Sequence, residues 1–88
     1  MKALRIKTLD HVLNTHRFKI LLLKEIIVFD SVYLVDKSQG SLRLELKNGA
    51  SFLLFLDCHL EEFDKFQLDL EKFRANEDYY FDLSVWRE

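Results

Sequence analysis

The chain has 88 residues, of which 49% are hydrophobic and 14% aromatic, and its formal net charge is −2. This length gives a single domain over residues 1–88, and this composition excludes an intrinsically disordered chain. The near-neutral balance favours no class of charged partner. A body this small cannot bury so many large side chains, so we expect an apolar patch on its surface, and such a patch usually marks a partner site.

The cysteine content and the lengths of the apolar segments indicate the compartment. Cys58 is the single cysteine, so it has no intramolecular partner, whereas small secreted domains usually need disulfides. No apolar stretch of the kind found in a signal peptide follows the basic residues near the N-terminus. The longest apolar region, residues 20–29, is interrupted by Lys24 and Glu25 and is too short to span a bilayer. We therefore expect a cytoplasmic protein.

The N-terminal segment predicts two short elements. Residues 3–7 alternate between apolar and polar side chains and predict a short edge strand. Thr8 is a favourable helix cap, and three aliphatic residues follow it at helical spacing. Residues 8–16 are therefore predicted as a possible short N-terminal helix.

The middle of the chain is rich in Ile, Val, Leu and aromatic residues, which favour strands. Residues 18–29 are compatible with one bent strand, with two strands or with a partly helical segment, because a short apolar run does not reveal its period. Asp30 and Ser31 predict a turn or a sharp bend before a strand at residues 31–35.

The next segment predicts a β-hairpin. Residues 36–40 form a loop, residues 41–47 alternate without interruption, and Asn48-Gly49 is the preferred pair for a two-residue type I′ turn into residues 50–56. With that turn, the second strand is apolar on both faces, one of which joins the leucines of the first strand. The apolar residues on its other face are Phe52, Leu54 and Leu56. A strand of this kind is covered on both sides, here by the helix that follows and by another part of the chain or another subunit.

The C-terminal part predicts a helix and a last strand. Residues 59–74 carry an apolar stripe at helical spacing, with Asp57 as N-cap and Asn76 as the C-terminal stop. Residues 79–86 then alternate as a strand, and one face mixes aromatic with polar side chains, a mixture enriched at protein interfaces. The aromatic members of that face are Tyr80 and Trp86.

Together these elements predict an α+β fold: an antiparallel β-meander sheet of four to six strands, with one amphipathic helix of the C-terminal half packed on a face and a possible short N-terminal helix. Over about residues 24–74, the order of elements is similar to the C-terminal half of pleckstrin-homology-like or GRAM-like domains. The additional strand after the helix departs from that pattern, and a likeness of fold carries no function by itself.

No motif in the sequence predicts catalysis, a metal ion or a cofactor. Cys58 and His59 are adjacent at a helix start and point apart, so we expect a structural cysteine. His11 and His16 lack the spacing and the cysteine ligands of a zinc site. The acidic residues of the first helical turn lack the glycine of a calcium loop, and they stabilise their own helix. With two glycines in the whole chain, a phosphate-cradling loop is difficult to build.

We therefore expect a non-enzymatic protein–protein interaction module of the inhibitor, adaptor or immunity type. Its expected partners are a second copy of itself, in a homodimer, and an unidentified protein. The residues expected to contact these partners are Phe52, Leu54, Leu56, Tyr80 and Trp86.

Two alternatives remain open at this point. The basic N-terminal third predicts binding to nucleic acid or to an anionic membrane surface. The residues that would make this contact are Lys2, Arg5, Lys7, Arg17, Lys19 and Lys24. An enzyme is the further alternative, and it would need an active site shared across a dimer interface.

Overall fold

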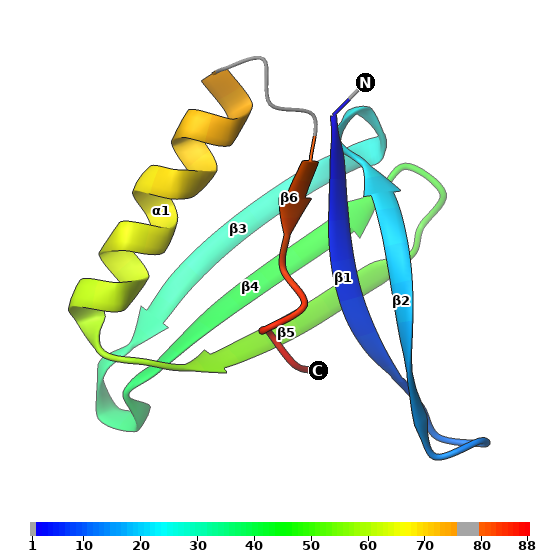
Figure 1. Ribbon diagram of the computed structural model, residues 1–88, viewed down its shortest axis with the longest axis horizontal. Helices are drawn as coiled ribbons and strands as arrows, with labels where there is room; N and C mark the ends of the chain where they lie inside the picture. The colour runs from blue at the N-terminus through cyan, green and yellow to red at the C-terminus, as the bar shows by residue number, and fades with distance from the viewer. Residues whose placement is uncertain (1, 76–79) are drawn as a thin grey trace.

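The computed structural model describes residues 2–75 and 80–88, which form an α+β fold (Figure 1). One strand pair and a three-stranded meander precede the helix, and a short strand follows it. The elements are β1 (Ala3–Asp10), β2 (Thr15–Leu22), β3 (Ile26–Leu34), β4 (Gln39–Leu46), β5 (Ser51–Asp57), α1 (Leu60–Ala75) and β6 (Tyr80–Asp82), with short 3-10 turns at Leu23–Glu25 and Val35–Lys37.

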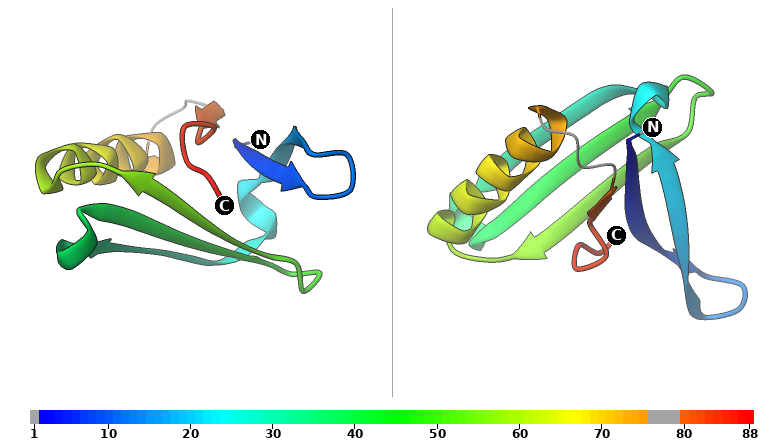
Figure 2. Two further views of the ribbon diagram at one scale, coloured as in Figure 1. Left: turned by 90° about the horizontal axis from the view of Figure 1, so that it is seen from below. Right: turned by 45° about the horizontal axis from the view of Figure 1, so that its top comes forward.

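The strands form two small sheets rather than one continuous meander. The N-terminal sheet has the order β2-β1-β6, with β2 antiparallel and β6 parallel to β1. The meander sheet has the order β3-β4-β5 and is antiparallel throughout. Figure 2 shows α1 and β6 on the same side of the meander sheet, so the core lies between that sheet, the helix and the N-terminal sheet.

The core follows the alternation of the strands and the apolar stripe of the helix. Fully buried aliphatic side chains come from both sheets, and aromatic side chains come from α1 and from the C-terminal segment. The largest buried side chains are Leu4, Ile6, Leu42, Leu44, Leu54, Phe73, Leu83 and Trp86. The predicted helical stripe is confirmed at Phe63, Leu70 and Phe73, which are buried.

The possible N-terminal helix is absent, and β1 continues through residues 8–10 into a hairpin. Thr8 is 6% exposed and points toward the core, as an alternating strand residue does. Asn14 adopts a left-handed conformation with φ of 51°, which asparagine tolerates in turns. Turn chemistry at both ends of residues 10–15 therefore overrides the weak helical spacing.

The break in the β-rich region lies earlier than the sequence indicated. β2 ends at Leu22, and β3 runs through Asp30 and Ser31 without a turn. Asp30 is opposite Arg43 across the strand pair, and the Ser31 side chain lies 3.0 Å from the amide oxygen of Gln67 in α1. Ser31 thus has a hydrogen-bond partner in the helix, and Asp30 is exposed within the strand.

The meander confirms the β4–β5 hairpin but with a different turn. The Gly49 amide donates to the Leu46 carbonyl at 3.0 Å, the Leu46 amide donates to the Ala50 carbonyl at 2.8 Å, and Gly49 has φ of 91°. This is a three-residue loop with glycine at the left-handed position. The register is consequently one residue away from the predicted one, and a one-residue shift exchanges the two faces of a strand.

The corrected register changes which side chains of β5 face inward. Leu54 lies opposite Leu42, and Phe52 lies opposite Leu44, so both belong to the core side of the sheet. Leu53, opposite Arg43, lies on the outer side and is 48% exposed. Within the described residues, no element covers that outer side of the meander sheet (Figure 2).

The helix begins at Leu60, three residues after the cap that the sequence indicated. Asp57 ends β5 instead, and the His59 amide points to the carboxylate of Glu62 at 3.4 Å, as in one half of a capping box. The predicted stop at Asn76 lies outside the described residues. The helix packs closely on β4, because a Cβ atom at Gly40 would lie 2.9 Å from both the Phe63 and the Trp86 rings.

The C-terminal strand is shorter than predicted and runs parallel to β1, and residue 79 lies outside the described residues. After β6, the Leu83 amide donates to the Arg5 carbonyl at 2.7 Å. The chain then turns inward at Trp86, which is 1% exposed and lies 4.8 Å from the Phe66 ring. Arg87 exchanges two backbone hydrogen bonds with Phe55 and so pairs with the edge of β5.

Candidate interaction surface

The β1–β2 hairpin projects from the body of the molecule, and we call residues 7–20 the arm (Figure 1). All residues from 11 to 20 are exposed, including the successive residues of β2 that point to opposite faces. Side chains on both faces of β2 are therefore in contact with solvent. The arm is therefore a strand pair in which β2, over residues 15–20, packs against the core on neither of its faces.

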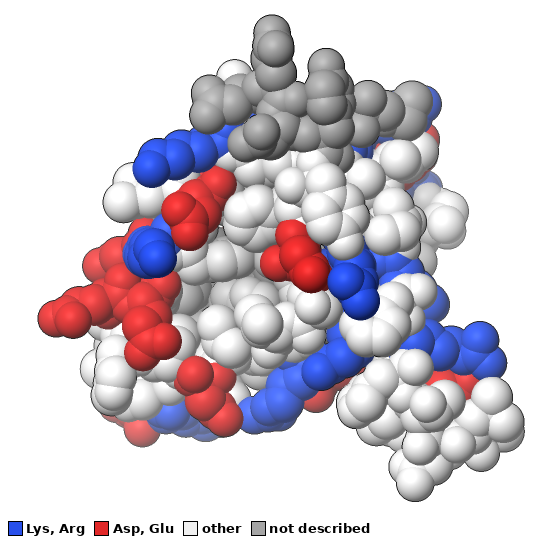
Figure 3. Space-filling view, in the orientation of Figure 1, with Lys and Arg blue, Asp and Glu red and all other residues white. Residues whose placement is uncertain are grey.

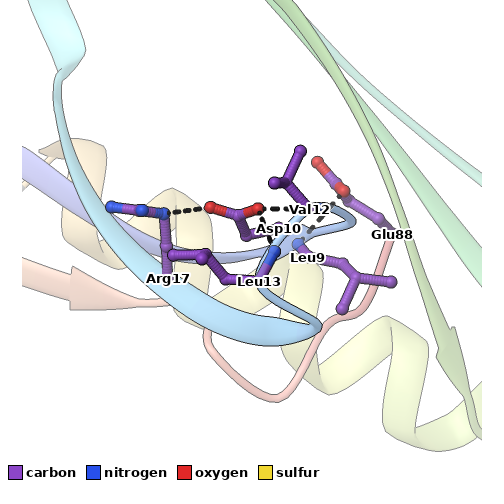
Figure 4. Close-up of polar contacts among 6 residues, drawn as sticks. All are labelled: Leu9, Asp10, Val12, Leu13, Arg17 and Glu88. Carbon is purple, nitrogen blue, oxygen red and sulfur yellow. Dashed lines mark hydrogen bonds and ion pairs between the residues drawn. The ribbon is translucent and has the colours of Figure 1, made fainter.

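Two aliphatic side chains occupy the tip of the arm. Val12 is 93% exposed and Leu13 is 62% exposed. The Asp10 carboxylate accepts hydrogen bonds from the backbone amides of both residues at 3.0 Å, through the same oxygen (Figure 4). Its other oxygen accepts from Nε of Arg17 at 2.6 Å. The turn that presents the two apolar side chains is thus held in one conformation by a fully used carboxylate.

The hydrogen bonds of the tip also control the charge of Asp10. The amide of Leu13 and then the guanidinium of Arg17 hold the pKa of the Asp10 carboxyl below its usual value. A carboxylate that accepts charge-assisted and backbone hydrogen bonds stays ionised, because each donor stabilises the charged form. The tip is therefore organised at neutral pH.

The C-terminus of the chain reaches the base of the tip. The Leu9 amide lies 3.3 Å from a carboxylate oxygen of Glu88. A hollow of about 200 Å³ lies beside this contact. Its lining residues are Lys7, Leu9, His16, Arg87 and Glu88. The arm and the C-terminal residues therefore form one continuous surface.

The side of the N-terminal sheet that points away from the core forms a second part of this surface, which we call the outer face. The register places on it Arg5, Lys7 and Leu9 from β1, His16, Phe18 and Ile20 from β2, and Tyr80 and Asp82 from β6. Its most exposed large hydrophobic side chains are Phe18 at 54%, Ile20 at 58% and Tyr80 at 51%. Each of the three strands of this sheet thus contributes side chains to an open apolar and cationic face.

Cation contacts organise the middle of the outer face. The guanidinium carbon of Arg5 lies 4.2 Å from the centroid of the Phe18 ring. Its Nη1 atom lies 3.4 Å from the carboxylate of Asp82, and Lys7 is directly opposite Phe18 in the register. The cations of the arm, at the right of Figure 3, lie beside uncharged surface and away from the acidic residues of the helix at the left. The molecule is therefore electrostatically asymmetric.

The residues that the sequence predicted for partner contact do not form one surface. Leu54 is 0% exposed and Trp86 is 1% exposed, so the chain's own core occupies both side chains. Phe52 and Leu56 are partly buried and pack against that core. Tyr80 is exposed, on the outer face. The register and the inward turn at Trp86 are the physical reasons for this difference.

The six basic residues predicted for nucleic-acid contact divide into separate groups. Nζ of Lys2 donates to the carbonyls of Phe73 and Arg74 at the end of α1, at 2.5 and 2.6 Å. Arg17 pairs with Asp10, and Nζ of Lys19 lies 5.4 Å from the Phe52 ring. Lys24 is exposed in the 3-10 turn after β2. Arg5 and Lys7 are the two members that share the outer face.

Sequence reasoning missed the residues that now define the surface. Val12 and Leu13 were assigned to a helix, although Asp10 and Asn14 on either side of them are turn residues and carried the signal. Tyr80 comes to the same face as Phe18 through the parallel pairing of β6 with β1, a long-range contact with no local signal. The surface therefore depends on tertiary structure.

Other candidate chemistry has a structural explanation or remains unassembled. Cys58 is buried, and desolvation raises the pKa of its thiol, with Glu62 and Asp57 adding to the effect. This favours a structural role, because the thiolate is the reactive form. Among residues 2–75 and 80–88, no three metal-ligating side chains lie close together. No helix in that part of the chain has the length and apolarity to cross a membrane.

Comparisons of this chain with protein-family models, with curated proteins and with solved structures return no match. The likeness of element order to pleckstrin-homology-like domains gains no support from them and carries no functional argument.

Proposed function

We propose that this chain is a non-enzymatic binding protein of the adaptor type, which holds a partner protein at the tip of its arm. One observation carries the proposal: Val12 and Leu13 are 93% and 62% exposed, on a turn that is stabilised by the hydrogen bonds of Asp10 to their amides and to Arg17. The fold gains little from side chains so exposed. A rigid apolar protrusion of this kind fits the anchor that a protein interface buries at its centre.

The energetics support a modest anchor surrounded by further contacts. Full burial of a Val or Leu side chain contributes about 1.5–3 kcal/mol, so the tip offers about 3–6 kcal/mol when Val12 and Leu13 enter a pocket. The locked turn lowers the ordering cost that binding would otherwise carry. The neighbouring polar side chains of His16 and Arg17 then supply a rim, as in other protein interfaces.

Self-association stays part of this proposal, but on a different surface. The outer side of the meander sheet carries Val32 and Leu53, which are 49% and 48% exposed. These two residues replace Phe52, Leu54 and Leu56 as the candidates for contact between copies, because the latter face the core.

The experiment compares native complexes in extracts of cells that encode this chain. The protein, at its natural abundance, is expected to elute from a sizing column in a species larger than the free chain. Leu13→Ser should shift it to the size of the free chain or of its dimer, since a polar side chain cannot occupy an apolar pocket. Leu68→Ser, at a 56% exposed position on α1, is the matched control and should leave the large species intact. Equal behaviour of the two variants contradicts the proposal.

A further inference from the structure

We propose that the outer face of the N-terminal sheet binds single-stranded nucleic acid, with Phe18 and Tyr80 as stacking platforms for bases. This inference goes beyond the protein contact at the tip of the arm, and its two stacking side chains take no part in that contact. It would make the chain an adaptor between a protein and a nucleic-acid strand.

The two aromatic rings stand on opposite edges of the sheet. Phe18 pairs with Lys7 and Tyr80 pairs with Ala3, so the two rings are separated by four residues along β1 and lie on either side of it. With ordinary strand geometry they are roughly 13 Å apart along the strand and roughly 10 Å apart across the sheet. This diagonal distance matches a short single-stranded oligonucleotide, at the low end of the site sizes of about 4–16 nucleotides that such platforms bind.

Both rings are available for stacking. Phe18 is 54% exposed and Tyr80 is 51% exposed. Arg5 lies 4.2 Å from the centroid of the Phe18 ring and therefore supports it from one direction. Sheet faces with exposed aromatic side chains bind single strands because every base has an apolar π-face, and duplex bases are already stacked on one another.

The charges of the outer face favour an anionic occupant. Arg5 and Lys7 lie between the two rings, and His16 extends the row of donors toward the tip. Among residues 2–75 and 80–88, the acids at this face are Asp82, whose carboxylate lies 3.4 Å from Arg5, and Glu88, which is close to the Leu9 amide at the far end. A second copy placed on the same face would bring the cations of both copies together. A phosphate backbone, in contrast, would neutralise them.

The test is fluorescence anisotropy with the full chain and labelled 12-nucleotide single strands of mixed sequence, one RNA and one DNA. We expect at least one of them to bind at low salt, and the same strand annealed to its complement to bind at least tenfold more weakly. Phe18→Ala and Tyr80→Ala should each weaken binding by about 5- to 150-fold, from a stacking contribution of about 1–3 kcal/mol per base. Lys7→Ala should lower the salt slope by about 0.7.

Leu68→Ala is the matched control, because Leu68 is 56% exposed on α1 and belongs to neither the tip of the arm nor the outer face. Its affinity should equal that of the wild type, and circular dichroism should show all variants folded. The proposal is overturned if neither strand binds at about 100 μM of protein, which is the weak end of ordinary non-specific dissociation constants. It is also overturned if the duplex binds as well as the single strand.

The variants also separate this inference from the proposed contact at the tip. Leu13→Ser should release the protein partner and leave oligonucleotide binding unchanged, whereas Phe18→Ala should do the reverse. If Phe18→Ala dissolves the large species in extracts while no oligonucleotide binds, the outer face belongs to the protein partner and the nucleic-acid assignment is rejected.

Discussion

Replacing Trp86 with alanine tests whether this side chain is a core residue, as the structure places it, or a contact residue for a partner. Trp86 is 1% exposed, and its ring centroid lies 4.8 Å from that of Phe66. The ring packs directly against Gly40. A buried aromatic side chain removes about 150–250 Å² from water, which corresponds to about 4–6 kcal/mol at about 25 cal/mol per Å². Measured Trp→Ala losses in cores are about 3–5 kcal/mol, so we expect a loss of about 4 kcal/mol.

This loss is large for a chain of this size. At about 0.05–0.15 kcal/mol per residue, the total stability is about 4–13 kcal/mol, so Trp86→Ala should remove a third or more of it. With a slope of about 1 kcal/mol per molar urea, the unfolding midpoint should fall by about 4 M. Far-UV circular dichroism is the suitable readout, because the substitution removes the single tryptophan.

The neighbouring Val85 provides the control. It is 69% exposed, so Val85→Ala should change the unfolding free energy by less than about 0.5 kcal/mol. If Trp86→Ala also stays within that limit, Trp86 does not pack in the core, and the reasoning about the C-terminal segment is refuted.

Three further predictions follow from particular contacts. Gly40→Ala should lower the melting temperature, since the added Cβ would lie 2.9 Å from the Phe63 and Trp86 rings. Overpacking costs about 1–3 kcal/mol of stability, and each kcal/mol lowers the melting temperature by about 4–8 °C. An unchanged or higher melting temperature would contradict the packing described. The backbone amide resonances at the tip of the arm should titrate with Asp10. Because the pKa of Asp10 is lowered, the hydrogen bonds are present at neutral pH and are lost as the pH falls below the usual carboxyl value of 3.8. A titration midpoint above 3.8 would show that these donors do not hold the carboxylate. Light scattering of the wild type should give a mass above that of the free chain at high concentration, and Leu53→Arg should lower it, because a buried charge opposes association; a wild type that is strictly monomeric at every concentration rejects self-association.

The parts of the fold that local chemistry determines were predictable from the sequence. The α1 stripe and the β4–β5 hairpin are confirmed because their spacing and their turn residues agree with each other. Asn48-Gly49 predicted the hairpin but not its register, since the same pair serves two-residue and three-residue loops. That difference of one residue moved Leu54 from an expected interface into the core.

The remaining differences come from competition between local signals and from long-range pairing. The aliphatic residues at 9–13 have helical spacing, yet Asp10 satisfies two backbone amides in a turn and so offers the backbone an alternative to a helix. The short strand β6 pairs with β1 across most of the chain, and no local pattern indicates a parallel partner. For this reason the outer face, with Phe18 and Tyr80 on it, could not be predicted from the sequence.

Site-specific photo-crosslinking tests most directly whether the tip of the arm is the point of contact with a partner protein. A photoreactive amino acid replaces Leu13 in one variant and Leu68 on α1 in another, since both side chains are well exposed, at 62% and 56%. After irradiation in cells that encode the chain, position 13 should give a discrete crosslinked band, which Val12→Ser weakens, and position 68 should give none. The account is contradicted if position 13 gives no band or if both positions give the same bands.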